Sequence, residues 1–127
     1  MAKVSGLPTT VSVGGNAIGP DVGSLTLSTP YGVQDITGVN SSALERLLLR
    51  ADAQLTLNAF FNATAGQSHA SLKTPGSKAI VIVYANGAVT ATFTAVQTDC
   101  TWDLAADGSL TMSAPFQLSS GTAVAWT

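Results

Sequence analysis

Alternating apolar and polar residues along most of the chain predict β-strands. The clearest case is residues 79–96, where a β-branched run leads through Asn86-Gly87 into a run with apolar residues at every second position. Successive side chains of a strand point to opposite faces, and Asn-Gly favours a tight turn between two strands. This stretch therefore predicts a β-hairpin whose first strand, Ile80 to Val83, is well buried.

Further short strands are predicted on both sides of this hairpin. Turn-forming pairs such as Asp107-Gly108 separate these strands. Pro30 either ends the strand at residues 23–28 or makes it an edge strand. The candidates are residues 9–19, 23–28, 98–104, 110–117 and 122–126. The pattern predicts one mainly β domain over residues 1–127, a β-sandwich or barrel of antiparallel strands.

Residues 42–50 break the strand pattern and predict one short α-helix that flanks the sheet. Ser42 and Glu45 fit a capping box, in which each side chain satisfies a backbone N–H group at the start of a helix. Leucines at positions 44, 47 and 48 then form one apolar stripe. A helix this short is not stable alone in water, so we expect its leucines to pack on the sheet.

After this predicted helix the period returns to two over residues 54–61, which predicts a strand. Phe60 and Phe61 are adjacent and would face opposite sides of that strand. One of them therefore needs a cover, such as another segment or another subunit. A second helical turn is predicted across Gln67 to Leu72 and ended by Pro75.

The predicted surface carries very few charges. Charged residues make up 9% of the chain, against about 25% in a typical soluble domain, and the formal net charge is −2. So neutral a surface favours self-association. The five cations are scattered, so they form no basic stripe that could grip phosphates. No apolar run approaches the roughly 20 residues needed to cross a membrane, and we expect the chain to fold in a cytoplasm without membrane insertion.

Residues that could carry chemistry are isolated from one another. Cys100 and His69 are the only cysteine and the only histidine, whereas a zinc site needs three or four ligands. Asp99, Asp103 and Asp107 recur at every fourth position, unlike the alternate oxygens of a calcium loop. We expect no metal, no cofactor and no catalytic site, and an enzyme using His69 is the weakest hypothesis.

The order of these segments resembles the major tail tube proteins of long-tailed bacteriophages. In that family an early strand leads through a segment like Asp35 to Gly38 into a short helix containing Glu-Arg. An Ala-Asp turn, here Ala51-Asp52, and a strand ending in aromatic residues, here Phe60-Phe61-Asn62, come next. The family's paired strands around an Ala-Asp-Gly-Ser turn correspond to the C-terminal part. The resemblance covers roughly residues 20–126.

This resemblance implies a structural virion protein rather than an enzyme. Six copies would form a ring by joining inner sheets edge to edge, and stacked rings would form the conduit for genome delivery in a phage tail. The implied partners are further copies of the chain and the terminator, tape measure and distal tail proteins. Double-stranded DNA would pass through a neutral or acidic lumen without specific binding.

Candidate residues follow from this picture. A segment that reaches the neighbouring ring is expected at Thr29 to Asn40, with residues 1–10 as a docking arm. The self-assembly candidates are Tyr31, Glu45, Arg50, Phe60 and Trp126, and the candidate lumen acids are Asp21, Asp99 and Asp103. Two alternatives stay open: a capsid decoration or head–tail joining protein, and a carbohydrate- or ligand-binding β-sandwich that uses Trp102, Trp126 or Tyr31 as stacking surfaces.

Overall fold

Antiparallel β-strands make up most of the structure, which confirms the predicted mainly β class. The computed structural model describes residues 9–127, so the predicted docking arm, residues 1–10, lies outside the described residues except for Thr9 and Thr10. The first strands are β1 (Thr10–Val13), β2 (Asn16–Ala17), β3 (Val22–Ser28), β4 (Tyr31–Asp35), β5 (Arg46–Ala51) and β6 (Gln54–Phe60). The later strands are β7 (Gly76–Tyr84), β8 (Val89–Gln97), β9 (Thr101–Leu104), β10 (Leu110–Leu118) and β11 (Ala125–Trp126). The short helices are η1 (Gly19–Asp21), α1 (Ser68–Leu72) and η2 (Ala85–Gly87).

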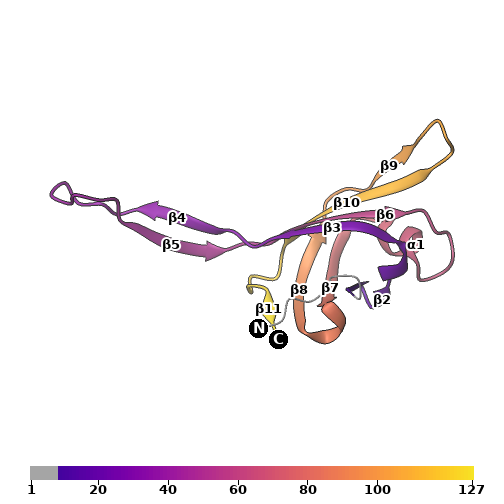
Figure 1. The fold of residues 1–127 in the computed structure, drawn as a ribbon, viewed down its shortest axis with the longest axis horizontal. Coiled ribbons are helices and arrows are strands. Elements are labelled where there is room, and N and C mark those ends of the chain that lie inside the picture. Colours follow the sequence, from indigo (N-terminus) through magenta and orange to yellow (C-terminus); the bar gives the residue numbers. More distant parts are fainter. Residues whose placement is uncertain (1–8) are drawn as a thin grey trace.

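Nine strands form one sheet that folds over on itself. Its order is β2-β1-β7-β8-β10-β6-β3, with β9 paired to β10 and β11 paired to β8. Strands β8 and β10 share only a short register, from Phe116 opposite Gln97 to Leu118 opposite Ala95. At this corner the sheet changes direction, so β7 and β8 run across β3, β6 and β10 (Figure 1). The two halves enclose the hydrophobic core.

The core is built from every second residue of these strands, as the alternating pattern predicts. On β6, Leu55, Leu57 and Ala59 are buried, and their neighbours in sequence are exposed. The same alternation holds on β8 and β10. The other large core side chains are Val11, Val13, Ile18, Leu72, Ile80, Ile82, Phe93, Met112 and Phe116. The predicted hairpin turns are also present, since Gly87 and Gly108 adopt φ of 94° and 92°, which only glycine reaches without strain.

The predicted helix at residues 42–50 is wrong. Residues 46–51 form strand β5, which pairs with β4 in a separate two-stranded sheet. Ser42 and Glu45 form no capping box; instead the Thr37 hydroxyl accepts a hydrogen bond from the Glu45 N–H at 2.7 Å. We infer that the helix fails because this hairpin projects away from the body (Figure 1), so no sheet lies beneath its leucines to stabilise a helix. The α-helix of the described chain is α1, within the second predicted turn.

Candidate functional site

The four adjacent strands β9, β10, β6 and β3 present an outward surface, here called the polar face. Paired residues lie on the same side of a sheet, so the registers define its members. Most of them are uncharged and polar: Ser24, Thr26, Ser28, Gln54, Thr56, Asn58, Thr101, Thr111, Ser113 and Gln117. Phe60 and Pro115 are the apolar members, and Asp103, opposite Thr111, is the only charged one. Among residues 9–127, no lysine or arginine lies on this face.

Local contacts keep the polar face ordered. The Asn58 side-chain amide donates a hydrogen bond to the Ser24 hydroxyl across β6 and β3 at 3.0 Å. Near the end of β6, the Phe60 ring lies against Gly23, where an added Cβ would approach the ring to 3.1 Å. Gly23 therefore leaves the space in which the half-exposed Phe60 ring rests.

Both outer edges of this four-stranded surface are open in the described part of the chain. Strand β3 ends the sheet order next to β6, and β9 has β10 as its partner on one side. An unpaired edge presents a row of backbone N–H and C=O groups that can pair with another chain. The polar face is thus bounded by two edges suited to strand addition.

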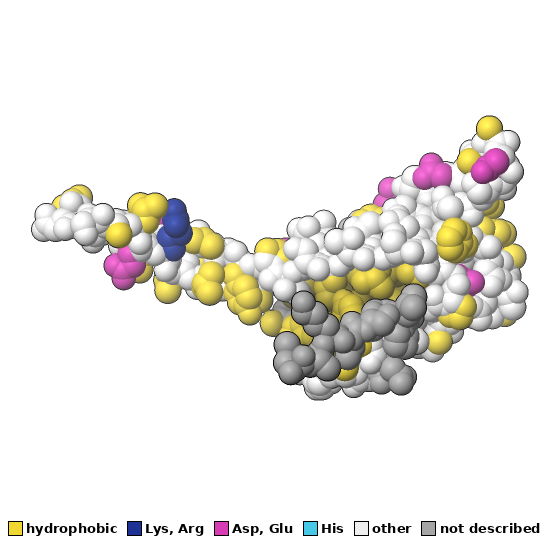
Figure 2. Space-filling model, viewed as in Figure 1, with side chains coloured by type: hydrophobic (Ala, Val, Ile, Leu, Met, Phe, Trp, Pro, Cys, Tyr) yellow, Lys and Arg dark blue, Asp and Glu magenta, His cyan; other side chains and the backbone are white. Residues whose placement is uncertain are grey.

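The second surface is the arm, defined as residues 29–52, which contains β4 and β5. It extends from the body as a long two-stranded ribbon (Figure 1). Apolar side chains are distributed along it between its charged groups (Figure 2). The exposed apolar side chains of the arm, with exposed fractions of 44% to 101%, are Tyr31, Val33, Ile36, Val39, Leu44, Leu47, Leu48 and Leu49. A lone two-stranded hairpin is marginal in water, so this concentration of apolar area indicates a surface that another chain covers.

Both faces of the arm carry leucine. Val33 pairs with Leu48 on one face, and Gln34 pairs with Leu47 on the other. Gly32 lies against Leu49, whose Cβ would be 3.3 Å from a Cβ added at position 32. A cover on one face alone would leave the other leucines in water.

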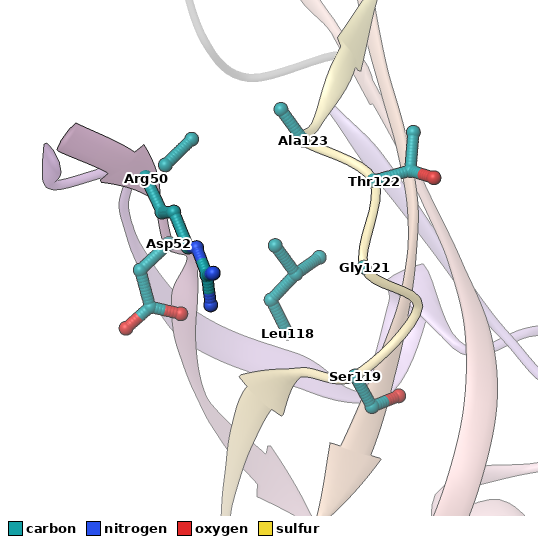
Figure 3. A pocket seen from close by; sticks show the side chains of 8 residues that line it. Arg50, Asp52, Leu118, Ser119, Gly121, Thr122 and Ala123 are labelled. Carbon is teal, nitrogen blue, oxygen red and sulfur yellow. The ribbon is translucent and has the colours of Figure 1, made fainter.

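A hollow of about 470 Å³ lies where the arm joins the body. Arg50 extends into it from β5, opposite Gly121 and Ala123, while the Asp52 carboxylate points away (Figure 3). Asp52 Oδ1 accepts a hydrogen bond from the Ala53 N–H, which fixes the turn into β6. Arg50 and Asp52 are the charged residues that line the hollow, and because the Asp52 carboxylate points away, no set of catalytic groups converges there among the described residues.

An aromatic cluster lies at the other end of the body. The centroid of the His69 ring is 5.3 Å from the ring centroids of both Phe61 and Trp102, and the Phe61 and Trp102 centroids are 6.0 Å apart. Phe61 and Trp102 are 39% and 43% exposed, and Leu104 beyond them is 75% exposed. These four residues are here called the distal patch. His69 packs there between aromatic rings, with no metal-binding group of three or more ligands in residues 9–127.

The candidate lumen acids occupy three different environments. Asp103 lies on the polar face. Asp21 instead accepts hydrogen bonds from the Asn62 amide at 3.1 Å and from the Ser68 N–H at 3.2 Å, and so anchors the start of α1. Asp99 lies in the loop after β8, where Oδ1 accepts a bond from the Cys100 N–H. Only Asp103 belongs to a continuous strand surface.

The self-assembly candidates are spread over the molecule. Tyr31, Glu45 and Arg50 are exposed on the arm, and Phe60 lies on the polar face. Trp126 is half exposed on β11, where it stacks on Tyr84 at 6.3 Å. Sequence reasoning missed the arm leucines as a surface because it assigned them to a buried helix stripe. The run Leu47-Leu48-Leu49 was the available signal, since three consecutive leucines cannot all face one sheet.

A buried polar network joins α1 to the sheet, and no local sequence pattern predicts it. The buried Gln97 amide donates to Leu72 O at 2.6 Å and to Asp99 O at 3.0 Å. Lys78 Nζ donates to Ser71 O at 2.6 Å and to the Gln97 side-chain oxygen. Burial lowers the pKa of Lys78 from its ordinary value. These contacts fix the position of α1 and are structural.

Comparisons with known proteins agree on the fold. No protein-family model matches the sequence, and no curated protein matches it. Among solved structures, a chain from the virion of a native gene transfer agent particle is similar over 99% of both chains, with a TM-score of 0.70 and 11% identity. A chain from the tail of an empty gene transfer agent particle, determined with C6 symmetry, has a TM-score of 0.65 and 12% identity. That match covers 84% of this chain and 82% of the other. None of the described helices is long and apolar enough to cross a membrane. On the evidence of the two structural matches, the protein shares the fold of chains found in tail and virion particles.

Proposed function

We propose that this protein is a structural, non-enzymatic subunit of a phage-type tail tube, and that it assembles into stacked six-membered rings. The observation that carries the proposal is the polar face, a cation-free sheet surface lying between two open edges. The fold similarity to chains of gene transfer agent tail and virion particles supports it.

The polar face has the chemistry expected of a lumen for DNA. Lysine and arginine bind phosphates and release counterions, so a wall that carries them would retain the duplex. Hydroxyl and amide groups with one acid per subunit do not bind phosphates in this way. In a ring, Asp103 would supply the acid of this wall, whereas Asp21 is engaged within its own chain.

Strand directions support ring closure through the open edges. Neighbouring strands from β9 through β10 and β6 to β3 are all antiparallel, so β3 and β9 run in opposite directions. Rotation about a ring axis keeps the direction of every strand. The β3 edge of one copy would therefore meet the β9 edge of the next in antiparallel orientation, and a closed ring would leave neither of these two edges free.

The arm would supply contacts beyond a single ring. Strand β4, residues 31–35, lies within Thr29 to Asn40, the segment predicted to reach the neighbouring ring. The arm continues beyond that segment through β5 to residue 52. Burying its leucines against other copies would contribute about 25 cal/mol for each square ångström of apolar surface removed from water. Terminator, tape measure and distal tail proteins are the proposed partners at the tube ends, in a virion tail assembled in the host cytoplasm.

Negative-stain electron microscopy with mass photometry, over a series of protein concentrations, tests this proposal. We expect rings or hollow tubes of uniform width. A monomer at every concentration, also in the presence of tail initiator proteins, would refute it.

The charge of the lumen gives a separate test. Asp103→Lys should leave the fold and the tubes intact but make tubes bind double-stranded DNA at low salt, with an affinity that falls steeply as salt is added. Asp99→Lys, in the loop after β8 and outside the polar face, is the matched control. Equal DNA binding by tubes of both variants would show that Asp103 does not line the lumen.

A further inference from the structure

Two hairpins protrude from opposite ends of the strands that form the polar face. The arm leaves between Ser28 and Gln54, which pair at one end of β3 and β6. At the other end Phe60 pairs with Thr111, and the β9–β10 hairpin continues beyond this pair. Figure 1 shows the arm and this hairpin on opposite sides of the body. The arm therefore cannot reach the distal patch of its own chain.

The apolar chemistry of these two ends is complementary. Val39, Leu44 and Leu48 on the arm are 101%, 64% and 66% exposed. The distal patch offers half-exposed aromatic rings and Leu104, and burial of an aromatic side chain is among the largest contributions to an interface. No segment within residues 9–127 covers either surface. Contact between the arm of one copy and the distal patch of another would remove both apolar surfaces from water.

The arm also supplies cations, which the distal end lacks. No lysine or arginine follows Lys78 in the sequence, so the β9–β10 hairpin carries Asp103 and Asp107 without a cation. The arm carries Arg46 and Arg50, two of the five cations of the chain, together with the acids Asp35, Glu45 and Asp52. Hydrogen bonds from Ser109 lower the pKa of Asp107, so its carboxylate is ionised at neutral pH. Two of the arm's acids are engaged within the chain: Asp35 accepts hydrogen bonds from Thr37, and Asp52 accepts one from the Ala53 N–H.

We propose that the arm of one copy packs on the distal patch of a copy in the next ring, with its leucines on Trp102 and Leu104 and an arginine near Asp107. This inference rests on the proposed stacking of rings. Stacked rings that keep one orientation bring the arm end of one subunit toward the distal end of a subunit in the adjacent ring. Such a contact is heterologous, because the two surfaces differ, and its repetition extends a tube.

Cross-linking tests the contact directly. In a Cys100→Ser background, one protein carries Leu48→Cys and a second carries Leu104→Cys; the two are mixed, assembled and treated with a short bis-maleimide. We expect dimers containing one copy of each protein, in tubes but not in monomers. Replacing the second protein by Ala88→Cys, an exposed site in the β7–β8 turn, should lower the yield at least tenfold. Equal yields from both mixtures would overturn the inference.

A second variant separates this inference from the proposed function. Leu104→Ser should leave thermal unfolding and ring formation unchanged and reduce tube formation at least tenfold, while Leu104→Met should behave as the unchanged protein. Tubes formed normally by Leu104→Ser, or loss of rings as well as tubes, would overturn the distal patch as an inter-ring contact. If the unchanged protein forms neither rings nor tubes, the proposed function itself fails, and the inference falls with it.

Discussion

Strands β5 and β6 follow one another along the chain, separated only by Asp52 and Ala53, and both are rich in leucine. On β5, Leu47, Leu48 and Leu49 are 49%, 66% and 46% exposed. On β6, Leu55 and Leu57 are 1% and 0% exposed. The same residue type thus stabilises the monomer in one strand and, in our proposal, an assembly in the other. A leucine run shows that a segment needs a cover, but it does not show which chain provides the cover.

Aspartate substitutions on the two strands should separate these roles most strongly. Leu57→Asp would bury an unpaired carboxylate in the core and should destabilise the monomer by about 4 kcal/mol or more, which prevents folding. Leu48→Asp places the same group in water and should leave thermal unfolding unchanged while abolishing tubes. Circular dichroism and electron microscopy on both variants provide the measurement. Unfolding of Leu48→Asp would mean that the monomer needs the arm leucines after all.

The body could be predicted from the sequence, because its strands alternate with a period of two and are punctuated by turn residues. Leu55, Leu57, Ala91 and Phe93 all lie on the buried faces that this alternation predicts. Sequence reasoning failed at residues 42–50. There, leucine spacing fits an amphipathic helix, but no surface of the same chain lies beneath it to stabilise one. The polar face was equally hidden, since it depends on which strands are neighbours, a tertiary property that local patterns do not contain.

Substitution in the buried polar network should give the next largest change in the free energy of unfolding, and it affects only the body. Gln97→Ala removes the donor to Leu72 O and an acceptor of Lys78, so the free energy of unfolding should fall by about 1–3 kcal/mol. Gln117→Ala, on the exposed polar face, should change it by no more than about 0.5 kcal/mol. Urea unfolding of both variants measures the difference. An equal effect at the two positions would show that Gln97 is not a structural link to α1.

Removing the arm should cost the monomer less than losing Gln97 does. Ser28 and Gln54 are paired in the β3–β6 register, so Asn-Gly can replace residues 29–52 and form a three-residue hairpin connection with the retained Ala53. We expect the shortened chain to fold as a monomer, with a free energy of unfolding within about 1 kcal/mol of the complete chain, because the buried Ala53 stays in place. It should form no tubes. Cooperative unfolding in urea tests the first expectation, and a failure to fold would show that the body and the arm are one folding unit.

The smallest effect concerns the pH dependence of the arm turn. Asp35 Oδ1 accepts hydrogen bonds from the Thr37 hydroxyl at 2.6 Å and the Thr37 N–H at 2.9 Å, and these bonds lower the pKa of Asp35 below its ordinary value of 3.8. Because the folded pKa is lowered, the stabilisation of the turn is fully present above pH 3.8 and is lost as the pH falls through the folded value. The amide proton of Thr37 should therefore shift in nuclear magnetic resonance spectra only below pH 3.8, whereas core amides of β6 should not respond there.

Thr37→Val should return the titration of Asp35 toward its ordinary range. A Thr37 amide that responds together with the β6 amides would mean that the arm turn and the body unfold as one unit in acid.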